Sequence, residues 1–205
     1  MPVIVVANPK GGVGKTTLCT NIAGYLASRG HAVMLGDADR QHSARTWVSL
    51  RPADLPRIAT WEVAHDDIVR PPKGTTHVVL DTPAGLHGKR LDDVMKLADK
   101  VLIPLQPSIF DIHATHEFIR QLLAHRRADK VSMAIVGMRT REGTISTDQL
   151  RGFLGGVKLP LLGFVRDTQN YVHLAAHGMT LFDMSSSRFE RDLEQWLPIT
   201  QWLDA

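Results

Sequence analysis

The sequence has almost no cysteine and no long hydrophobic run, and both shortages narrow what the chain can be. Cys19 is the single cysteine among 205 residues, which excludes an internal disulfide and any cluster that takes several thiolates from one chain. The early apolar run at 3–7 is far shorter than the ~20 residues of a membrane span, and no secretory signal is present. We therefore expect a cytoplasmic protein with no membrane attachment.

The chain also lacks internal repeats and low-complexity segments. Its 43% hydrophobic and 22% charged residues are typical of a globular protein. A length of 205 residues suits one well-filled core. We expect a single domain over residues 1–205.

Short apolar runs alternate with helix-length amphipathic segments, which predicts a parallel sheet covered by helices on both faces. The expected strands are 3–7, 32–37, 58–63, 77–81, 101–105, 133–138 and 161–165. The expected helices are 14–29, which Gly30 should end, 91–98, 109–127 and 187–197, which Pro198 should end or kink. Phe189, Leu193, Trp196 and Leu197 should share the core-facing side of the last helix. The pattern predicts an α/β fold with a mainly parallel, twisted sheet of about seven strands.

The stretch NPKGGVGKTT, residues 8–17, lies between the first expected strand and the first expected helix. Apart from Pro9, which stands where the first glycine is expected, it fits the phosphate-binding pattern G-x-x-x-x-G-K-[ST]. Lys15 can reach the β and γ phosphates of a nucleotide, and Thr16 can ligate Mg²⁺. Three glycines permit the backbone turns that aim N–H groups at phosphate, namely Gly11, Gly12 and Gly14. The context of strand, loop and helix favours a nucleotide site over a flexible glycine turn.

KGGVGKTT resembles the deviant Walker A motif of the ParA/MinD family of P-loop ATPases, in which the upstream lysine is the signature. The position before that lysine is not always glycine in the family, so Pro9 does not count against the site. The resemblance implies a P-loop NTPase fold, ATP and Mg²⁺ as ligands, and a homodimer in which Lys10 reaches the partner's nucleotide. A cation supplied in trans can accelerate phosphoryl transfer by ~10³–10⁵. The implied nucleotide contacts are Lys10, Gly11, Gly12, Val13, Gly14, Lys15, Thr16 and Thr17.

Two acidic strand ends should lie beside this loop. GDADRQ, residues 36–41, has carboxylates at Asp37 and Asp39, which share one side of an extended segment at the ligand-binding edge of the sheet. The segment resembles the family's D-x-D-P-Q motif, which implies that Asp39 positions the attacking water and that Asp37 supports Mg²⁺ or the loop. Arg40 replaces the family's proline.

HVVLDTPAG, residues 77–85, is an apolar run that ends in aspartate, as a Walker B strand does. Asp81 should hold Mg²⁺ through water, because Mg²⁺ keeps much of its hydration shell. The residues that follow resemble a switch that senses the γ-phosphate, namely Thr82, Pro83 and Gly85.

Two further segments have weaker signals. PLQPSIFDIHAT, residues 104–115, resembles a stretch near the family's dimer face, with Ser108 and Asp111 as matching residues; the alternative is that one of them caps the following helix. Adenine recognition in the family falls on loops after the late strands, which implies Arg139, Arg166 and Asp167 here.

Basic residues are concentrated in the segment 120–166, which could meet a polyanion. It has nine basic residues, Arg120, Arg126, Arg127, Lys130, Arg139, Arg141, Arg151, Lys158 and Arg166, against the acids Asp129, Glu142 and Asp148. The alternative is a set of scattered, solvated cations. Candidate DNA contacts are Arg139, Arg141, Lys158 and Arg166.

The resemblance implies three possible functions. The first is a ParA-like partition ATPase without an N-terminal DNA-reading extension: its ATP-bound dimer binds nucleoid DNA non-specifically, and a cargo-bound, ParB-like partner releases it by stimulating hydrolysis. The second is a MinD-like ATPase that cycles on the membrane; the acidic polar face of the last expected helix argues against it. The third is a metabolic P-loop enzyme that resembles dethiobiotin synthetase, which Lys10 and the D-x-D pair disfavour.

Overall fold

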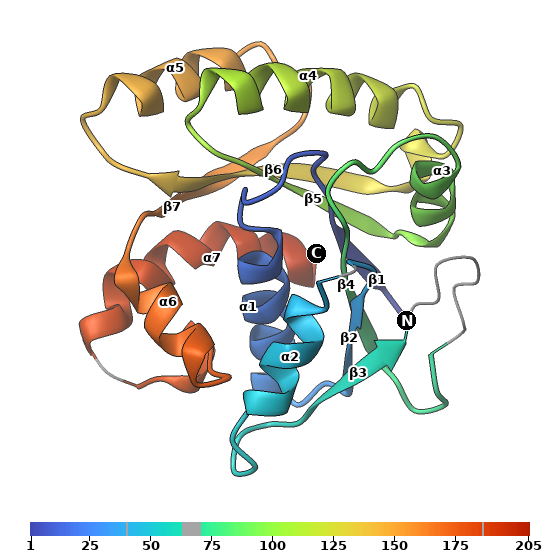
Figure 1. Cartoon of the computed structure of the whole chain (residues 1–205), viewed down its shortest axis with the longest axis vertical. Coiled ribbons are helices and arrows are strands. Elements are labelled where there is room, and N and C mark those ends of the chain that lie inside the picture. The colour runs from blue at the N-terminus through green and yellow to red at the C-terminus, as the bar shows by residue number, and fades with distance from the viewer. Residues whose placement is uncertain (40, 63–70, 186) are drawn as a thin grey trace.

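The computed structural model describes residues 1–39, 41–62, 71–185 and 187–205, so Arg40 and the end of the third expected strand, Val63, lie outside the described residues. Seven strands form one sheet in the order β3-β2-β4-β1-β5-β6-β7, and each pairing is parallel (Figure 1). The strands are β1 (Val3–Val6), β2 (Val33–Asp37), β3 (Ile58–Glu62), β4 (His77–Asp81), β5 (Lys100–Leu105), β6 (Ser132–Thr140) and β7 (Leu161–Arg166). The parallel sheet of seven strands predicted from the sequence is confirmed.

Among the described residues, a helix follows each strand except β3. The helices are α1 (Lys15–Ser28), α2 (Ser43–Leu50), α3 (Gly88–Leu97), α4 (Ile109–Leu123), α5 (Ile145–Leu154), α6 (Gln169–Ala176) and α7 (Glu190–Asp204), with short 3-10 turns η1 (Ala128–Lys130), η2 (Leu181–Asp183) and η3 (Ser187–Phe189). The sequence analysis located α1, α3, α4 and α7 but missed α2, α5 and α6. It also extended α4 too far, because the helix ends at Leu123 and not at 127.

The two faces of the sheet are covered by different helices, as Figure 1 shows. Ile4 and Val6 of β1 pack into a core with α1, α2, α6 and α7. Val3 and Val5, on the opposite side of the same strand, pack into a second core with α3, α4 and α5. This alternation along one strand places β1 at the centre of the molecule and its carboxyl end under the phosphate-binding stretch.

The last helix differs from its prediction in its bounds and in its packed face: α7 begins at Glu190, after the 3-10 turn η3, and ends at Asp204. It continues through Pro198 to Asp204, because Pro198 lies on the exposed side, where water can bind the carbonyl that has lost its helical partner. Phe189 and Trp196 are buried as expected, whereas Leu197 is exposed and does not belong to the packed face. In the described part of the chain, no helix combines the length and the apolar character needed to cross a bilayer.

Candidate nucleotide site

The phosphate-binding stretch joins β1 to α1, and its glycines have conformations that other residues rarely adopt. Gly12 and Gly14 have φ angles of 75° and 95°, in the left-handed region where a side chain is strained. A Cβ on Gly14 would also lie 2.9 Å from the Cε atom of Met138. The chain can therefore turn toward a ligand here only with glycine at position 14.

Asn8, which the sequence analysis did not single out, fixes the start of this loop. Its side chain is fully buried. Its Nδ2 donates to the Pro104 carbonyl at 2.7 Å and to Thr115 Oγ1 at 2.9 Å, and its Oδ1 accepts from the Lys10 amide at 2.8 Å. One side chain thus ties the loop to β5 and α4, and its position directly before the motif was the only signal in the sequence.

A cleft of about 670 Å³ opens over the loop. Lys15 reaches back across the loop, and its Nζ donates to the Lys10 carbonyl at 2.7 Å. Burial lowers the pKa of Lys15, and the negative charge of Asp81 opposes that shift. The described residues that line the cleft are Gly11, Gly12, Gly14, Lys15, Thr16, Thr17, Ala38, Asp39, Gln41, Ser43, Pro83, Ala84, Arg90 and Arg139. Two of the predicted nucleotide contacts are absent from this lining: Lys10, and Val13, which is fully buried.

Thr16 and Asp81 form the part of the site that suits a divalent cation. Thr16 Oγ1 donates to Asp81 Oδ2 at 2.6 Å, while the buried Oδ1 of Asp81 has no hydrogen-bond partner among the described residues. Burial raises the pKa of Asp81 to about 7, although the hydrogen bond from Thr16 opposes the shift. A cation beside a buried carboxylate would stabilise its ionised form, and oxygen ligands are the ones Mg²⁺ prefers. The residues present therefore fit the predicted magnesium ion.

Asp37 is held by backbone amides beside the cleft. Its Oδ2 accepts from the amides of Ala44 at 2.9 Å and Arg45 at 3.1 Å, and its Oδ1 accepts from the Asp39 amide at 3.0 Å. With three backbone N–H groups on its carboxylate, Asp37 caps α2 and orients the segment before it. Asp37 is absent from the cleft lining, whereas Asp39 does line the cleft, and a metal contact of Asp37 stays a prediction.

The segment after Asp81 lies partly at the cleft and partly against β1. Thr82 is buried, and its hydroxyl donates to the Val6 carbonyl at 2.8 Å, which turns it toward β1; its role as a switch stays a prediction. Pro83 lines the cleft as expected. The Gly85 amide donates to the Pro9 carbonyl at 2.8 Å, which joins this segment to the phosphate loop at the residue that departs from the general motif.

Lys10 lies at the edge of the cleft. Its Nζ is 4.0 Å from Asp111 Oδ1, in the first turn of α4. Ser108 occupies the position before α4, but its side chain makes no capping hydrogen bond. Helix capping therefore does not explain Ser108, and the structure brings Asp111 and Lys10 together.

A second hollow, of about 470 Å³, continues from the cleft and shares Gly14, Thr17 and Arg139 with it. All three residues predicted for adenine line it, namely Arg139, Arg166 and Asp167. Its other described walls are Met138, Val165, Thr168, Gln169, Tyr171, Val172 and Ala175. Arg139 has a φ of 50° and lies where the pairing of β6 with β7 is irregular, an unusual conformation that places it in both hollows.

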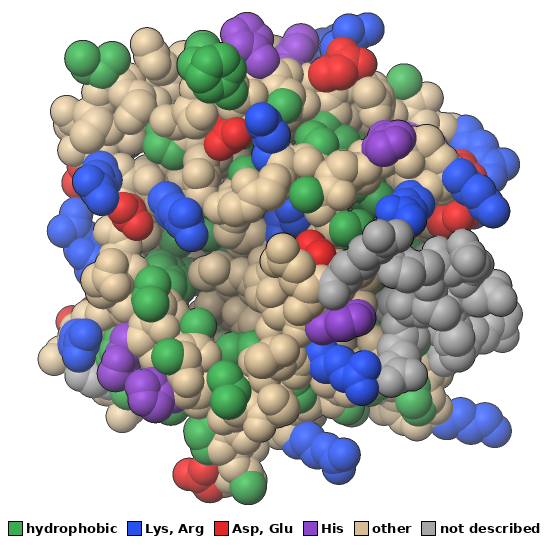
Figure 2. Space-filling model, in the orientation of Figure 1, with side chains coloured by type: hydrophobic (Ala, Val, Ile, Leu, Met, Phe, Trp, Pro, Cys, Tyr) green, Lys and Arg blue, Asp and Glu red, His purple; other side chains and the backbone are tan. Residues whose placement is uncertain are grey.

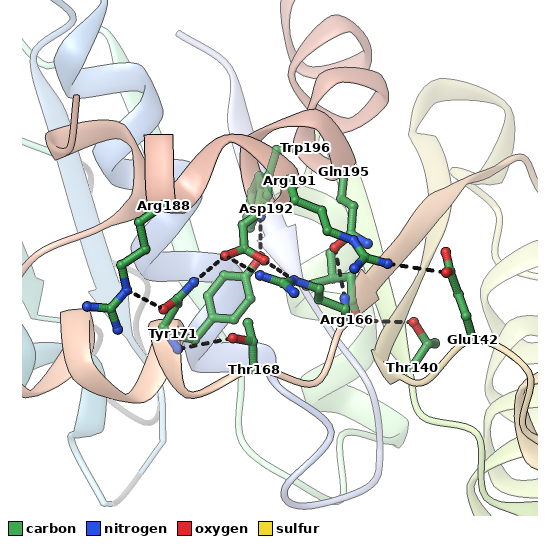
Figure 3. A network of polar contacts seen from close by, with 12 residues as sticks. Thr140, Glu142, Arg166, Thr168, Tyr171, Arg188, Arg191, Asp192, Gln195 and Trp196 are labelled. Carbon is green, nitrogen blue, oxygen red and sulfur yellow. Dashed lines mark hydrogen bonds and ion pairs between the residues drawn. The ribbon is translucent and has the colours of Figure 1, made fainter. Parts of the chain in front are cut away.

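The four candidate DNA contacts do not form one patch. Arg166 is held by the buried Asp192, to which its Nε and Nη2 donate (Figure 3), so its charge is half of an ion pair. Arg141 pairs with Asp167 at 2.6 Å but is largely exposed. Lys158 precedes β7 and so lies at the amino ends of the strands, whereas Arg139 and Arg141 lie at the carboxyl end of β6.

The sequence analysis missed other residues that shape the cleft. Gln106 Nε2 donates to the Gly12 carbonyl at 2.8 Å. Arg90, in the first turn of α3, lines the cleft, and no ion pair with another described residue holds it. Ser43 and Gln41 line it beside the start of α2. Gln106 lay within a quoted motif, but nothing near Arg90 in the sequence indicated a ligand.

The sequence was compared with protein families and with known proteins. Residues 4–181 match the CobQ/CobB/MinD/ParA nucleotide binding domain. The chain is 30% identical over 191 residues to maintenance of carboxysome distribution protein A of Halothiobacillus neapolitanus, covering 89% of this chain and 88% of that one.

Solved structures agree on the fold. The MinD cell division protein of Aquifex aeolicus superimposes with a TM-score of 0.76 at 20% identity, covering 100% of this chain and 97% of that one. A putative plasmid partition protein of Borrelia burgdorferi bound to AMPPNP gives 0.74 at 17% identity, covering 99% and 98%. Other structures of this fold contain ADP with magnesium. The chain belongs to the CobQ/CobB/MinD/ParA family of nucleotide-binding domains.

Proposed function

We propose that this protein is a ParA-like ATPase that works as an ATP-bridged homodimer and positions a cargo on DNA. One observation carries the proposal: Lys15 and Thr16 line the cleft and Thr16 binds the buried Asp81, while the second loop lysine, Lys10, is absent from the lining and lies beside Asp111. A lysine held outside its own cleft is placed to serve a neighbouring molecule's nucleotide.

Within one molecule, a few side chains of the site have separate functions. Lys15 exchanges its bond to the Lys10 carbonyl for the β and γ phosphates, because a charged acceptor binds an ammonium more strongly than a carbonyl does. Thr16 and Asp81 would hold Mg²⁺, which would supply charge neutralisation on the phosphates. Asp39, oriented through Asp37, positions the attacking water. The base occupies the second hollow.

The trans role of Lys10 can be tested by mixing two inactive variants. Lys10→Ala should not hydrolyse ATP because its dimer lacks the lysine that each subunit supplies to its partner's site. Asp39→Ala should not hydrolyse ATP because the attacking water is not positioned. A mixed dimer has one complete site, so the mixture should recover about a quarter of wild-type turnover for two-fold dimers that form at random. Recovery depends on the two chains meeting; if the mixture is as inactive as its components, Lys10 does not act in trans.

The proposed DNA surface lies at the end of β7, the edge strand of the sheet. A groove of about 420 Å³ there is lined by Arg141, Arg151 and Arg191, together with Glu142 and Asp167. Figure 2 shows Lys and Arg side chains along the left side of the molecule, level with the end of β7 in Figure 1. Exposed guanidinium groups of this kind bind a phosphate backbone without reading its sequence.

The names of similar proteins suggest what is positioned. One is named for the maintenance of carboxysome distribution, and another structure is described as a putative plasmid partition protein. We therefore propose a cargo of either kind, released when a cargo-bound, ParB-like partner stimulates hydrolysis. Sedimentation of the ATP-bound protein with DNA and, separately, with anionic liposomes tests this function: DNA binding supports it, and liposome binding alone would indicate a MinD-like membrane cycle instead.

A further inference from the structure

Side chains of helix α7 support a wall of the hollow that we propose for the base, although no residue of α7 lines that hollow. Asp192, on α7, is fully buried. Arg166 Nε and Nη2 donate to its two oxygens, and Asn170 Nδ2 donates to Oδ2 at 2.6 Å (Figure 3). Arg166 ends β7 and Asn170 is the second residue of α6, so Asp192 binds both ends of the short segment that joins the two elements.

That segment forms one wall of the hollow. Arg166, Asp167, Thr168 and Gln169 all line it. Two more contacts from α7 support the same wall: Gln195 Oε1 accepts from the Arg166 amide at 3.0 Å, and Trp196 Nε1 donates to Tyr171 Oη at 2.9 Å. Figure 3 shows Asp192, Gln195 and Trp196 projecting from α7 toward β7 and α6. Three neighbouring side chains of one helix thus set the position of the wall.

We propose that Asp192 is a positioning residue for the base: it fixes the β7–α6 segment and so supplies the part of ATP affinity that depends on the nucleoside. This proposal rests on the proposed nucleotide site. Asp192 lines neither the cleft nor the second hollow. Its effect should therefore be absent for a ligand that has phosphates but no base.

A matched control is available elsewhere in the molecule. Asp183 is also fully buried and also binds an arginine through both oxygens, Arg51, at 2.8 and 2.9 Å. Neither Asp183 nor Arg51 lines either hollow. Asp192→Asn and Asp183→Asn remove the same charge from similar buried pairs, so both should lower thermal stability. Only Asp192→Asn should alter recognition of the base.

The experiment measures the affinities of the full chain for Mg-ATP and for magnesium tripolyphosphate by calorimetry. We expect Asp192→Asn to weaken ATP binding by about tenfold and to leave tripolyphosphate binding within about twofold, because the loss is confined to the wall of one hollow. Asp183→Asn should preserve the wild-type ratio of the two affinities. Gln195→Ala removes a more exposed contact to the same wall and should reduce the ratio less; it replaces Asp192→Asn if that variant does not fold.

The outcomes separate the two levels of the proposal. If the wild-type protein binds tripolyphosphate as tightly as ATP, the proposed base site is wrong. If the wild-type protein prefers ATP but Asp192→Asn and Gln195→Ala keep its full preference, the base site stands and the positioning role of Asp192 is overturned. An equal loss in Asp183→Asn would also overturn it, because the effect would then follow from stability alone.

Discussion

The two ends of the proposed nucleotide site are constructed in different ways. The phosphate end consists of one loop whose backbone faces the cleft, supported by contacts from Asn8 and Gln106. The base end is a wall between β7 and α6 that depends on side chains from α7, more than twenty residues later in the chain. Backbone chemistry leaves a short glycine-rich motif in the sequence, whereas a side-chain network leaves none.

The difference also concerns charge. At the phosphate end, Lys15 and Arg90 face the cleft without a carboxylate ion pair among the described residues. At the base end, Arg166 is engaged by Asp192, and Asp167 is engaged by Arg141, which lies outside the lining of the hollow. Cations with no carboxylate partner suit a polyanionic triphosphate, while an arginine neutralised by an aspartate suits a neutral base. The predictions below test this contrast.

The largest effect should come from Lys15→Ala. It removes the only lysine that lines the cleft among the described residues, and with it charge-assisted hydrogen bonds to two phosphates. We expect ATP affinity to fall on the order of 10²–10³-fold, which equilibrium binding of a fluorescent ATP analogue would measure. Lys89→Ala is the control, since Lys89 is an exposed lysine that does not line the cleft. Unchanged affinity in Lys15→Ala would remove the basis for the phosphate site.

Asp39→Ala should separate binding from chemistry. Asp39 lines the cleft, and its amide is held by Asp37. We expect turnover to fall by about 10²–10⁴ while ATP still binds, because positioning and deprotonation of water are lost but the loop is intact. Single-turnover phosphate release together with sedimentation of the ATP-bound species would show both. Wild-type turnover in the variant would exclude a water-positioning role.

How far the sequence predicted the site follows from this contrast. The loop, Asp39 and Asp81 could be located because each sits at a strand end with a local pattern. The hydrogen bonds of Asp37 to the amides of Ala44 and Arg45, and of Thr82 to the Val6 carbonyl, could not be predicted, because tertiary structure sets these partners.

The fold shows the same division. The seven strands were predictable, because buried parallel strands are continuous apolar runs. Helix α2 was not, since its N-terminus is capped by Asp37 from outside the helix. The helix was predicted to end or kink at Pro198, because the sequence alone does not show that Pro198 lies on the exposed side of α7.

A smaller effect is expected from Arg90→Ala. Arg90 lines the cleft from α3 but is exposed, so solvent screens much of its interaction with a phosphate. We expect turnover to fall by about tenfold to a hundredfold, with a smaller change in ATP affinity, if its charge acts mainly on the transferring phosphate. Lys89→Ala, at the neighbouring exposed position outside the cleft lining, is the control. Equal behaviour of the two variants would mean that Arg90 is only a surface cation.

The smallest effect per residue should be at the groove beside β7. Replacing Arg141, Arg151 and Arg191 by alanine removes three cations that line it. We expect DNA affinity to fall about tenfold at moderate salt, and the slope of log affinity against log salt to decrease by about 3, because each phosphate contact contributes about 0.9 to that slope. Fluorescence anisotropy with a labelled duplex at several salt concentrations measures both quantities.

The matched control for that groove removes an equal charge from a different edge of the molecule. Arg120, Arg126 and Lys130 lie at and after the end of α4, away from the end of β7. A general electrostatic attraction would weaken equally in both triple variants, since net charge changes by the same amount. A local surface at β7 would weaken only in the first. Equal losses would therefore move DNA binding off the groove, and loss in the control alone would place it on the end of α4.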